Sequence, residues 1–439
     1  MNASPLTLPS ARPLGRQDYK TLSLAALGGA LEFYDFIIFV FFAVVLGKLF
    51  FPPSMPDWLS QLQTYGIFAA GYLARPLGGI VMAHFGDLFG RKRMFTLSIV
   101  LMALPTLAMG MLPTYHDIGI AAPLLLLTLR ILQGAAIGGE VPGAWVFVAE
   151  HAPSRHTGFA CGVITSGLTV GILLGSLIAT AINMAFSQQQ IAEWAWRVPF
   201  LIGGVFGLVA MQLRQWLHET PVFAEMKARK KLSRELPLKT VLKQHKTGVA
   251  LSMFLTWFLA IAIVVAILMA PAYLQKQFSI LPVDSLRANS LAVIALSFGC
   301  LVAGWLSDRI GSGFTLIGGS LLLGVSSHLF YSIMAQDSSQ LYPLYTLLGF
   351  SVGIVGAVPL VMVRVFPAAV RFSGLSFSYN VAYAFAGGLT PVLLSLWLKY
   401  DAMAPSYYLM VQCLIGLAAG IYLLLREKGG ALAETIDQP

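Results

Sequence analysis

The fold is indicated by a polar turn that reads HFGDLFGRKR at residues 84–93, between two apolar runs. A related turn, GWLSDRIG, stands at residues 304–311. The aspartates of the two turns, Asp87 and Asp308, are 221 residues apart, which is half of the chain. The sequence is therefore expected to contain two halves of the same organisation.

The composition places these turns in a membrane protein. Of the 439 residues, 57% are hydrophobic and only 11% are charged, whereas soluble domains contain about 25% charged residues. This chain has too little charge to cover a surface that faces water. The alternating pattern of a membrane β-barrel is absent, so helices are the remaining spanning structure.

Apolar runs of about 20 residues are long enough to cross a bilayer. Twelve of them are found, at 21–47, 60–85, 94–113, 120–149, 157–185, 197–217, 248–275, 287–306, 313–335, 341–365, 372–398 and 405–425. We therefore predict an all-α integral membrane protein with twelve transmembrane helices in two six-helix bundles. The bundles are expected at 1–217 and 248–439, joined by a basic linker at 218–247 that lies on the membrane as an amphipathic helix or is simply solvated.

Basic residues predict the orientation, because Lys and Arg accumulate on the cytoplasmic side of membrane proteins. With both termini in the cytoplasm, 21 of the 28 Lys and Arg residues fall on that side and five fall outside. We expect a multi-pass protein of the cell inner membrane, embedded in the lipid bilayer. The net charge of +9 is explained in the same way, and no nucleic-acid partner is expected.

Several kinds of chemistry are not indicated. The three cysteines, Cys161, Cys300 and Cys413, are far apart in apolar runs, and no Cys or His cluster suggests a metal site. The sequence has no phosphate-binding loop and no nucleophile with a neighbouring base. We expect neither an enzyme nor a cofactor, and we expect the energy to come from a proton gradient.

Charged residues within spans are the most direct evidence for function, since a charge at the bilayer centre costs several kcal/mol and usually marks a pathway. Glu32 lies 12 residues after Lys20, about 18 Å along a helix, and Asp35 follows on the same face. We predict that Asp35 carries protons, with Glu32 and Glu140 as further coupling carboxylates. The alternative is a structural ion-pair network that holds spans one, two and four together.

Substrate contacts are predicted from the buried cations and from a polar face. The Arg75 guanidinium suits a carboxylate, so a substrate with a carboxylate is expected. Ser373, Ser376, Asn380, Tyr383 and Gly387 follow one another at spacings of 3, 4, 3 and 4 and thus share one helix face, which lines a cavity or contacts a neighbouring helix. The candidate substrate-binding residues are Arg75, Arg130, Gln133, Tyr34, Asn380 and Tyr383.

The paired turns predict a conformational latch. Asp87 lies near the start of the third span, where a carboxylate meets the positive end of a helix dipole, and glycine permits a tight turn. A plain helix cap beside a basic membrane anchor is the alternative, but two copies in register favour the latch. Its residues are Asp87, Gly90, Arg91, Asp308 and Arg309.

The turn at 84–93 resembles the signature of the major facilitator superfamily, and further motifs are similar to its metabolite:proton symporter branch. These motifs are GGALEFYDF at 28–36, RPLG at 75–78, RILQG at 130–134, GGE at 138–140, EHAP at 150–153, WRVPF at 196–200, ETPVF at 219–223, FPAAVRFSG at 366–374 and GGLTP at 387–391. Leu88 and Arg364 depart from the pattern, which has an Arg and often an acidic residue at these places. The branch includes carriers of citrate, 2-oxoglutarate, shikimate, and proline or betaine.

The resemblance implies the major facilitator fold and proton-coupled symport of a small polar metabolite, an organic acid or a zwitterion, by alternating access. A proton-coupled exporter of drugs or other amphiphiles with the same fold is the first alternative. A membrane sensor that binds without transporting is the second. The expected partners are the small-molecule substrate, protons and lipid, and the protein is expected to be a monomer.

Overall fold

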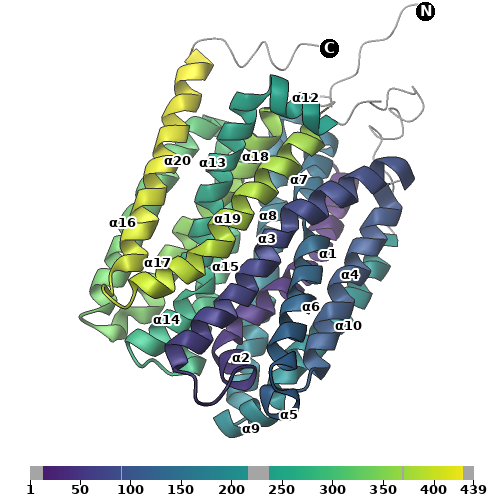
Figure 1. The fold of residues 1–439 in the computed structure, drawn as a ribbon. Coiled ribbons are helices and arrows are strands. Elements are labelled where there is room, and N and C mark those ends of the chain that lie inside the picture. The colour runs from purple at the N-terminus through teal and green to yellow at the C-terminus, as the bar shows by residue number, and fades with distance from the viewer. Residues whose placement is uncertain (1–12, 90, 216–236, 368–369, 429–439) are drawn as a thin grey trace, which may run out of the picture.

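The computed structural model describes residues 13–89, 91–215, 237–367 and 370–428. Within these ranges, the side chains that are not described are those of Glu32 and of residues 82–99, 213–215, 237 and 427–428. Every regular element in the described part of the chain is a helix (Figure 1).

The helices fall into two series along the sequence. The first series consists of α1 (Arg16–Phe41), α2 (Ala43–Leu49), α3 (Asp57–Phe89), α4 (Arg91–Met111), α5 (Tyr115–Ile118), α6 (Ala121–Ile137), α7 (Glu140–His151), α8 (Thr157–Ala185), α9 (Gln188–Glu193) and α10 (Val198–Gln215). The second consists of α12 (Pro237–Gln244), α13 (Lys246–Ile263), α14 (Ala270–Gln277), α15 (Pro282–Ile310), α16 (Ser312–Met334), α17 (Leu341–Val352), α18 (Val358–Arg364), α19 (Arg371–Trp397) and α20 (Ala404–Lys428). Short 3-10 turns occur at Ser154–His156, Ala195–Arg197 and Ser338–Gln340.

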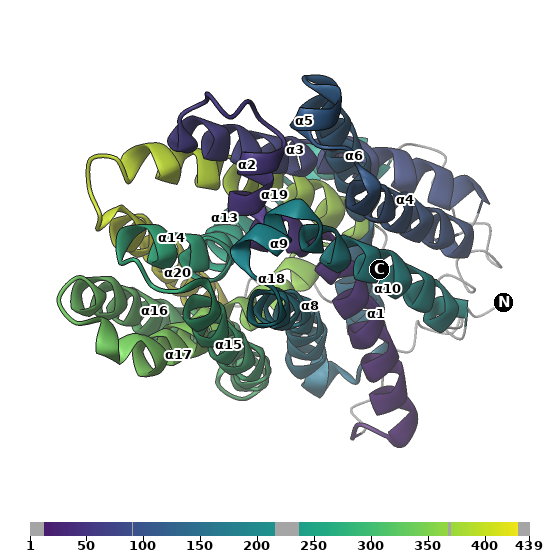
Figure 2. The same ribbon diagram turned by 90° about the horizontal axis from the view of Figure 1, so that it is seen from below.

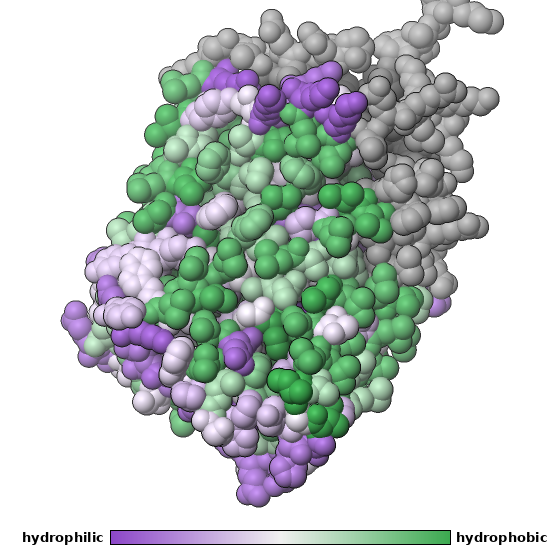
Figure 3. All heavy atoms as spheres, in the orientation of Figure 1, coloured by the Kyte–Doolittle hydropathy of each residue, from purple (hydrophilic) through white to green (hydrophobic). Residues whose placement is uncertain are grey.

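Ten helical segments in the described part of the chain are long and apolar enough to cross a membrane. They coincide with ten of the twelve predicted spans, and the other two predicted spans, 60–85 and 94–113, coincide with α3 and α4. Hydrophobic residues cover most of the height of the face in Figure 3, while hydrophilic residues gather toward its two ends. The predicted all-α, multi-pass membrane fold is confirmed.

Each series of helices packs mainly on itself. In the first series α1 packs on α8 and α10, and α3 and α4 pack on α6. In the second series α13 packs on α19 and α20, and α15 and α16 pack on α17. The boundaries 1–217, 218–247 and 248–439 stay predictions, and most of the linker lies outside the described residues.

The first series of helices is called the N-terminal half below, and the second series is called the C-terminal half. Two seams join these halves. Helix α3 packs against α19, and α8 packs against α15, as the view in Figure 2 also shows. The end of the molecule that carries α12 is called the α12 end, and the opposite end, which carries α14, is called the α14 end (Figure 1). The site must lie between these seams if both halves are to contribute to it.

Four spans are interrupted, and they hold corresponding places in the two halves. The first span breaks at Phe42, and the fourth at residues 138–139. The seventh contains a π-helix, η3, at Val264–Leu268, and the tenth a 3-10 helix, η5, at Gly353–Ala357. Such breaks release backbone groups from the helical pattern and occur often at functional sites. At membrane depth they are tolerated where the backbone is buried in protein or lines a cavity.

Candidate substrate and coupling site

Arg75 of α3 lies at the seam between the halves, surrounded by tyrosines. Its guanidinium carbon is 5.3 Å from the ring centre of Tyr72, 5.3 Å from that of Tyr379 and 4.6 Å from that of Tyr383. The Arg75 side chain is fully buried. None of its nitrogen atoms makes a hydrogen bond of standard geometry with a described residue. The guanidinium therefore rests on aromatic faces, a favourable place for a cation within about 6 Å of a ring centre.

The tyrosines around Arg75 come from both halves. Tyr72 of α3 stacks on Tyr383 of α19, with ring centres 5.2 Å apart and an angle of 10° between the rings. Tyr379 lies one turn before Tyr383, and the ring centres of these two are also 5.2 Å apart. Trp145 of α7 meets Tyr379 edge-on at 5.1 Å. We call Tyr72, Tyr379 and Tyr383 the tyrosine cage.

The polar face of α19 points to the N-terminal half. The Nδ2 atom of Asn380 donates hydrogen bonds to the carbonyl oxygens of Gly138 and Ser376. The Gly138 carbonyl is available because α6 ends there and α7 begins at Glu140. The predicted face at 373–387 thus contacts helices of the other half, and it does so beside the tyrosine cage.

Arg130 and Gln133 form a second buried cluster, within the N-terminal half. The guanidinium of Arg130 donates hydrogen bonds to the Phe36 carbonyl at 3.0 Å and to Gln133 Oε1 at 2.9 Å. It lies 4.2 Å from the Phe36 ring centre and 4.6 Å from that of Phe39. Gln133 Nε2 donates to Thr106 Oγ1 of α4. These bonds link α1, α4 and α6.

The Asp35 side chain packs against a different helix from the one that Arg75 meets. Its side chain is 1% exposed and lies against α10, because a Cβ atom on Gly203 would be only 2.6 Å from Asp35 Oδ1. Oδ1 makes no hydrogen bond with a described residue. Among the described side chains, Asp35 forms no ion pair with Arg75 or Arg130. The arginines are therefore not held in place by Asp35, while the side chain of Glu32 lies outside the described residues.

Two further predicted residues, Tyr34 and Glu140, are buried in the N-terminal half. Tyr34 points to α10: its hydroxyl donates to the Pro199 carbonyl at 2.7 Å, and its ring meets Phe206 edge-on at 5.0 Å. Glu140 is buried at the first position of α7, where the helix dipole stabilises a negative charge. The structure thus places Tyr34 in the packing between α1 and α10.

Asp308, predicted as a latch residue, joins the halves at the α12 end. Its carboxylate accepts hydrogen bonds from the backbone amides of Gly158 and Phe159, both at 2.8 Å. These amides lie in the first turn of α8, whose own N-cap, His156, provides no side-chain bond. Arg309 points to Trp305, with its guanidinium 5.7 Å from the ring centre. In the other predicted turn, Gly90 and the side chains of Asp87 and Arg91 lie outside the described residues.

A second contact of the halves at the α12 end is an ion pair. Arg371 at the start of α19 lies 3.5 Å from the Glu150 carboxylate near the end of α7. Nε of Arg371 also donates to the carbonyl oxygens of Val363 and Phe366. The two side chains are 23% and 10% exposed, so the pair is largely shielded from water.

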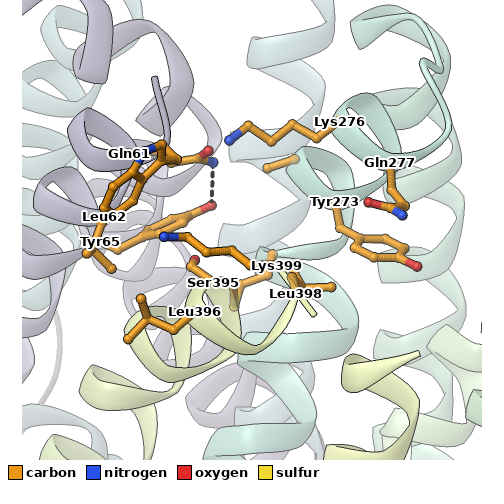
Figure 4. A pocket seen from close by; sticks show the side chains of 13 residues that line it. Gln61, Leu62, Tyr65, Tyr273, Lys276, Gln277, Ser395, Leu396, Leu398 and Lys399 are labelled. Carbon is orange, nitrogen blue, oxygen red and sulfur yellow. Dashed lines mark hydrogen bonds between the residues drawn. The ribbon is translucent and has the colours of Figure 1, made fainter. Parts of the chain in front are cut away.

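A cavity of about 180 Å³ opens at the α14 end, between α3, α14 and α19 (Figure 4). Both halves line it with polar groups, including Gln61, Lys276 and Lys399. Lys399, two residues after the end of α19, has its Nζ atom 3.2 Å from the ring centre of Trp58 of α3. Burial lowers the pKa of Lys276 from its usual value, although Asp57 opposes this shift.

The comparisons with known proteins agree with this architecture. Residues 36–391 match the family described as the Major Facilitator Superfamily. The chain belongs to this superfamily of membrane transporters. The resemblance found in the sequence motifs is thereby confirmed, and the chain is not an enzyme.

Relatives in this superfamily include carriers of small zwitterions. The chain is 33% identical to a proline/betaine transporter of Salmonella typhimurium, over 96% of this chain and 84% of the relative. It is 32% identical to a glycine betaine/proline/ectoine/pipecolic acid transporter of Dickeya dadantii, over 92% of this chain and 83% of the relative. It is also 32% identical to the proline/betaine transporter of Escherichia coli K12, over 92% of this chain and 82% of the relative.

Solved structures of the superfamily show the same fold. The xylose transporter of E. coli in a partially occluded inward open conformation superposes with a TM-score of 0.73, at 16% identity, over 93% of this chain and 98% of that one. The same symporter bound to 6-bromo-6-deoxy-D-glucose gives a TM-score of 0.74 at 17% identity, over 93% and 95% of the two chains. At this identity the likeness concerns the fold alone.

Tyr72, Tyr379 and Trp145 were not among the residues predicted from the sequence. A signal was present, because Tyr72 precedes Arg75 by three residues and Tyr379 precedes Tyr383 by four, so each pair shares a helix face. What the sequence could not provide is the meeting of these two faces across the seam of α3 and α19.

Proposed function

We propose that this member of the superfamily imports a small zwitterionic osmolyte of the proline and betaine type, together with protons. The observation that carries the proposal is the buried Arg75 at the seam of the two halves, beside tyrosines of both. A guanidinium suits the substrate's carboxylate, and ring faces suit its cationic group. The relatives named as transporters of proline, betaine and ectoine support the same class.

The proposed mechanism is alternating access. The bundles 1–217 and 248–439 rock about the site, which opens in turn to the two sides of the membrane. The contacts of Asp308 with α8 and of Arg371 with Glu150 close the α12 end. We place this end and both termini on the cytoplasmic side of the inner membrane, because most of the Lys and Arg residues of the sequence fall on that side. Breaking these contacts then opens the inward-facing state, and Asp87, Gly90 and Arg91 form the matching latch of the N-terminal half.

The proposed proton carrier is Asp35. Its carboxylate is buried and forms no ion pair with a described side chain, and a buried carboxylate within a span can take up and release a proton as its access changes. Glu140 is the second candidate, at the start of α7 near the Asn380 contact, and Glu32 is the third. In this arrangement Arg75, Asn380 and Tyr383 contact the substrate, while Arg130, Gln133 and Tyr34 link the site to α1, α4 and α10.

The test is uptake of radiolabelled proline and glycine betaine into proteoliposomes with an imposed pH gradient. The proposal predicts accumulation against the substrate gradient when the outside is acidic, and its collapse with a protonophore. Efflux of amphiphiles without uptake of these zwitterions would support the exporter instead. Binding without counterflow of label would indicate a sensor.

A further inference from the structure

We propose that the tyrosine cage is the subsite for a quaternary ammonium group, and that Arg75 fills it when substrate is absent. On binding, the substrate's ammonium replaces the guanidinium in the cage, and the guanidinium turns to the substrate's carboxylate. The inference rests on the proposed function and narrows its substrate class to methylated zwitterions of the betaine type.

The cage already holds a cation. Three ring faces surround the Arg75 guanidinium carbon at 4.6–5.3 Å, the distance range in which aromatic rings attract cations. A guanidinium is a flat and weakly hydrated ion, and a trimethylammonium group is likewise a weakly hydrated cation, although it is rounder. Rings that hold the first can hold the second, and aromatic cages are a general means of binding quaternary ammonium ligands.

The nitrogen atoms of Arg75 meet no carboxylate among the described side chains. The side chain is fully buried, yet none of its three nitrogens makes a hydrogen bond of standard geometry with a described residue. Buried polar groups are nearly always hydrogen-bonded, and a guanidinium presents two parallel donors that match a carboxylate. A zwitterion supplies two groups in one molecule: a carboxylate for Arg75, and a cation that takes the place of the guanidinium in the cage.

Arg130 is a partial contrast, because its Nη1 atom is already hydrogen-bonded within one half of the protein, while its Nε and Nη2 atoms make no hydrogen bond with a described residue. It also lies on aromatic rings, those of Phe36 and Phe39, but it donates hydrogen bonds to the Phe36 carbonyl and to Gln133. All these residues belong to the N-terminal half. The cage around Arg75 instead combines α3 with α19, so a ligand there stabilises the conformation in which the halves meet.

The experiment compares three ligands on the purified wild-type protein by thermal shift and by competition with labelled glycine betaine. Glycine betaine has both charges, 3,3-dimethylbutanoate has the same shape without the positive charge, and choline has the positive charge without the carboxylate. We expect glycine betaine to bind at least tenfold more tightly than either. Equal binding of glycine betaine and 3,3-dimethylbutanoate overturns the cage, and it does so without any substitution that could harm folding.

Substitutions then test whether the rings of the tyrosine cage bind the ammonium group. Tyr383→Leu should weaken binding of glycine betaine at least tenfold and of 3,3-dimethylbutanoate less than threefold, whereas Tyr383→Phe, which keeps the ring, should stay within threefold of wild type. Tyr331→Leu removes a buried tyrosine that packs on Tyr273 and Phe330 outside the cage, and it should affect both ligands equally. A Tyr383→Leu effect that is the same for both ligands contradicts the proposal.

Arg75→Ala separates this inference from the proposed function. Removing the guanidinium empties the cage, so choline should bind this variant more tightly than wild type, while glycine betaine should bind less tightly. If wild type neither binds nor transports proline or betaine, the proposed function fails, yet choline binding to Arg75→Ala still decides whether the cage holds quaternary ammonium groups. Choline binding that stays equal or weakens in Arg75→Ala overturns the inference.

Discussion

Asp308 lies directly against Gly158 at the α12 end, where its Oδ1 atom accepts a hydrogen bond from the Gly158 amide at 2.8 Å. The carboxylate of one half thereby caps a helix of the other. A negative charge at a helix N-terminus is stabilising. The contact requires the two halves to be closed at this end. The same aspartate that marked the sequence repeat is therefore part of the closed end.

Asp308→Asn should weaken this closure. The amide keeps an acceptor oxygen but loses the negative charge, which is worth about 1 kcal/mol at a helix N-terminus and corresponds to a change of roughly fivefold in the open–closed equilibrium. Spin labels at the exposed positions 155 and 310 should show a larger population of long distances. Substrate affinity should stay within a few-fold. Asp284→Asn, in an exposed pair on the same helix, is the control and should leave the distances unchanged.

Gly158→Ala should prevent the α12 end from closing. A Cβ atom there would lie 2.6 Å from both Asp308 Oδ1 and the Gly304 carbonyl oxygen, and overpacking of this kind costs about 1–3 kcal/mol. Uptake should fall at least tenfold, with normal amounts of protein in the membrane. Gly318→Ala, where no atom lies within 4 Å of the added Cβ, should transport normally. Wild-type uptake by Gly158→Ala would refute close packing of α8 on α15 as a condition for transport.

Glu150 and Arg371 should act as one unit. Because the pair is largely shielded from water, we expect a coupling of about 1 kcal/mol in a double-mutant cycle built on transport rates. Glu150→Gln and Arg371→Gln should each slow uptake severalfold, and the double variant should be little slower than Arg371→Gln alone. The exposed pair of Asp284 and Arg287 should show coupling near zero. Additive effects of the two substitutions would mean that the ion pair does not form during transport.

Asp35→Asn should uncouple transport from protons. Asparagine fits the same space but carries no proton, so exchange of labelled for unlabelled substrate should persist within about threefold while accumulation driven by a pH gradient falls at least tenfold. The two activities are measured in the same proteoliposomes. Should accumulation survive, Asp35 is not the proton carrier and Glu140 becomes the candidate. A parallel loss of both activities and of thermal stability would indicate a structural role.

Gly203→Ala should disturb Asp35 without changing its chemistry. The added Cβ would lie 2.6 Å from Asp35 Oδ1 and 2.7 Å from the Thr106 methyl carbon. The crowding should cost about 1–3 kcal/mol of stability, seen as a lower midpoint of thermal unfolding. Gradient-driven accumulation should fall more than exchange does. Gly66→Ala, which meets no atom within 4 Å, provides the comparison for a glycine substitution in a membrane helix.

The sequence determined the fold class, because the composition of each segment decides whether it lies in water, in lipid or in the protein interior. A run such as 248–275 is apolar on every face and can only be buried or lie in lipid. The turns at 84–93 and 304–311 made the two halves visible, and their motifs identified the superfamily, since these features depend on residues that are close together in the chain.

The sequence also selected Arg75, Asn380 and Tyr383, because a charged or polar residue within an apolar run is conspicuous. It could not predict which helix each side chain faces. Asp35 and Arg75 were expected at a similar depth, but Asp35 faces Gly203 and Arg75 faces α19.

Only the tertiary structure decided how the halves meet. Tyr72 and Tyr383 are far apart in the sequence and stack at 5.2 Å, and Asp308 reaches the amides of α8 from another helix. Such contacts depend on the rotation and register of helices that pack across a seam, where many arrangements bury the same apolar area. The pattern of one helix fixes which of its residues share a face, whereas the partner of that face is a property of the whole fold.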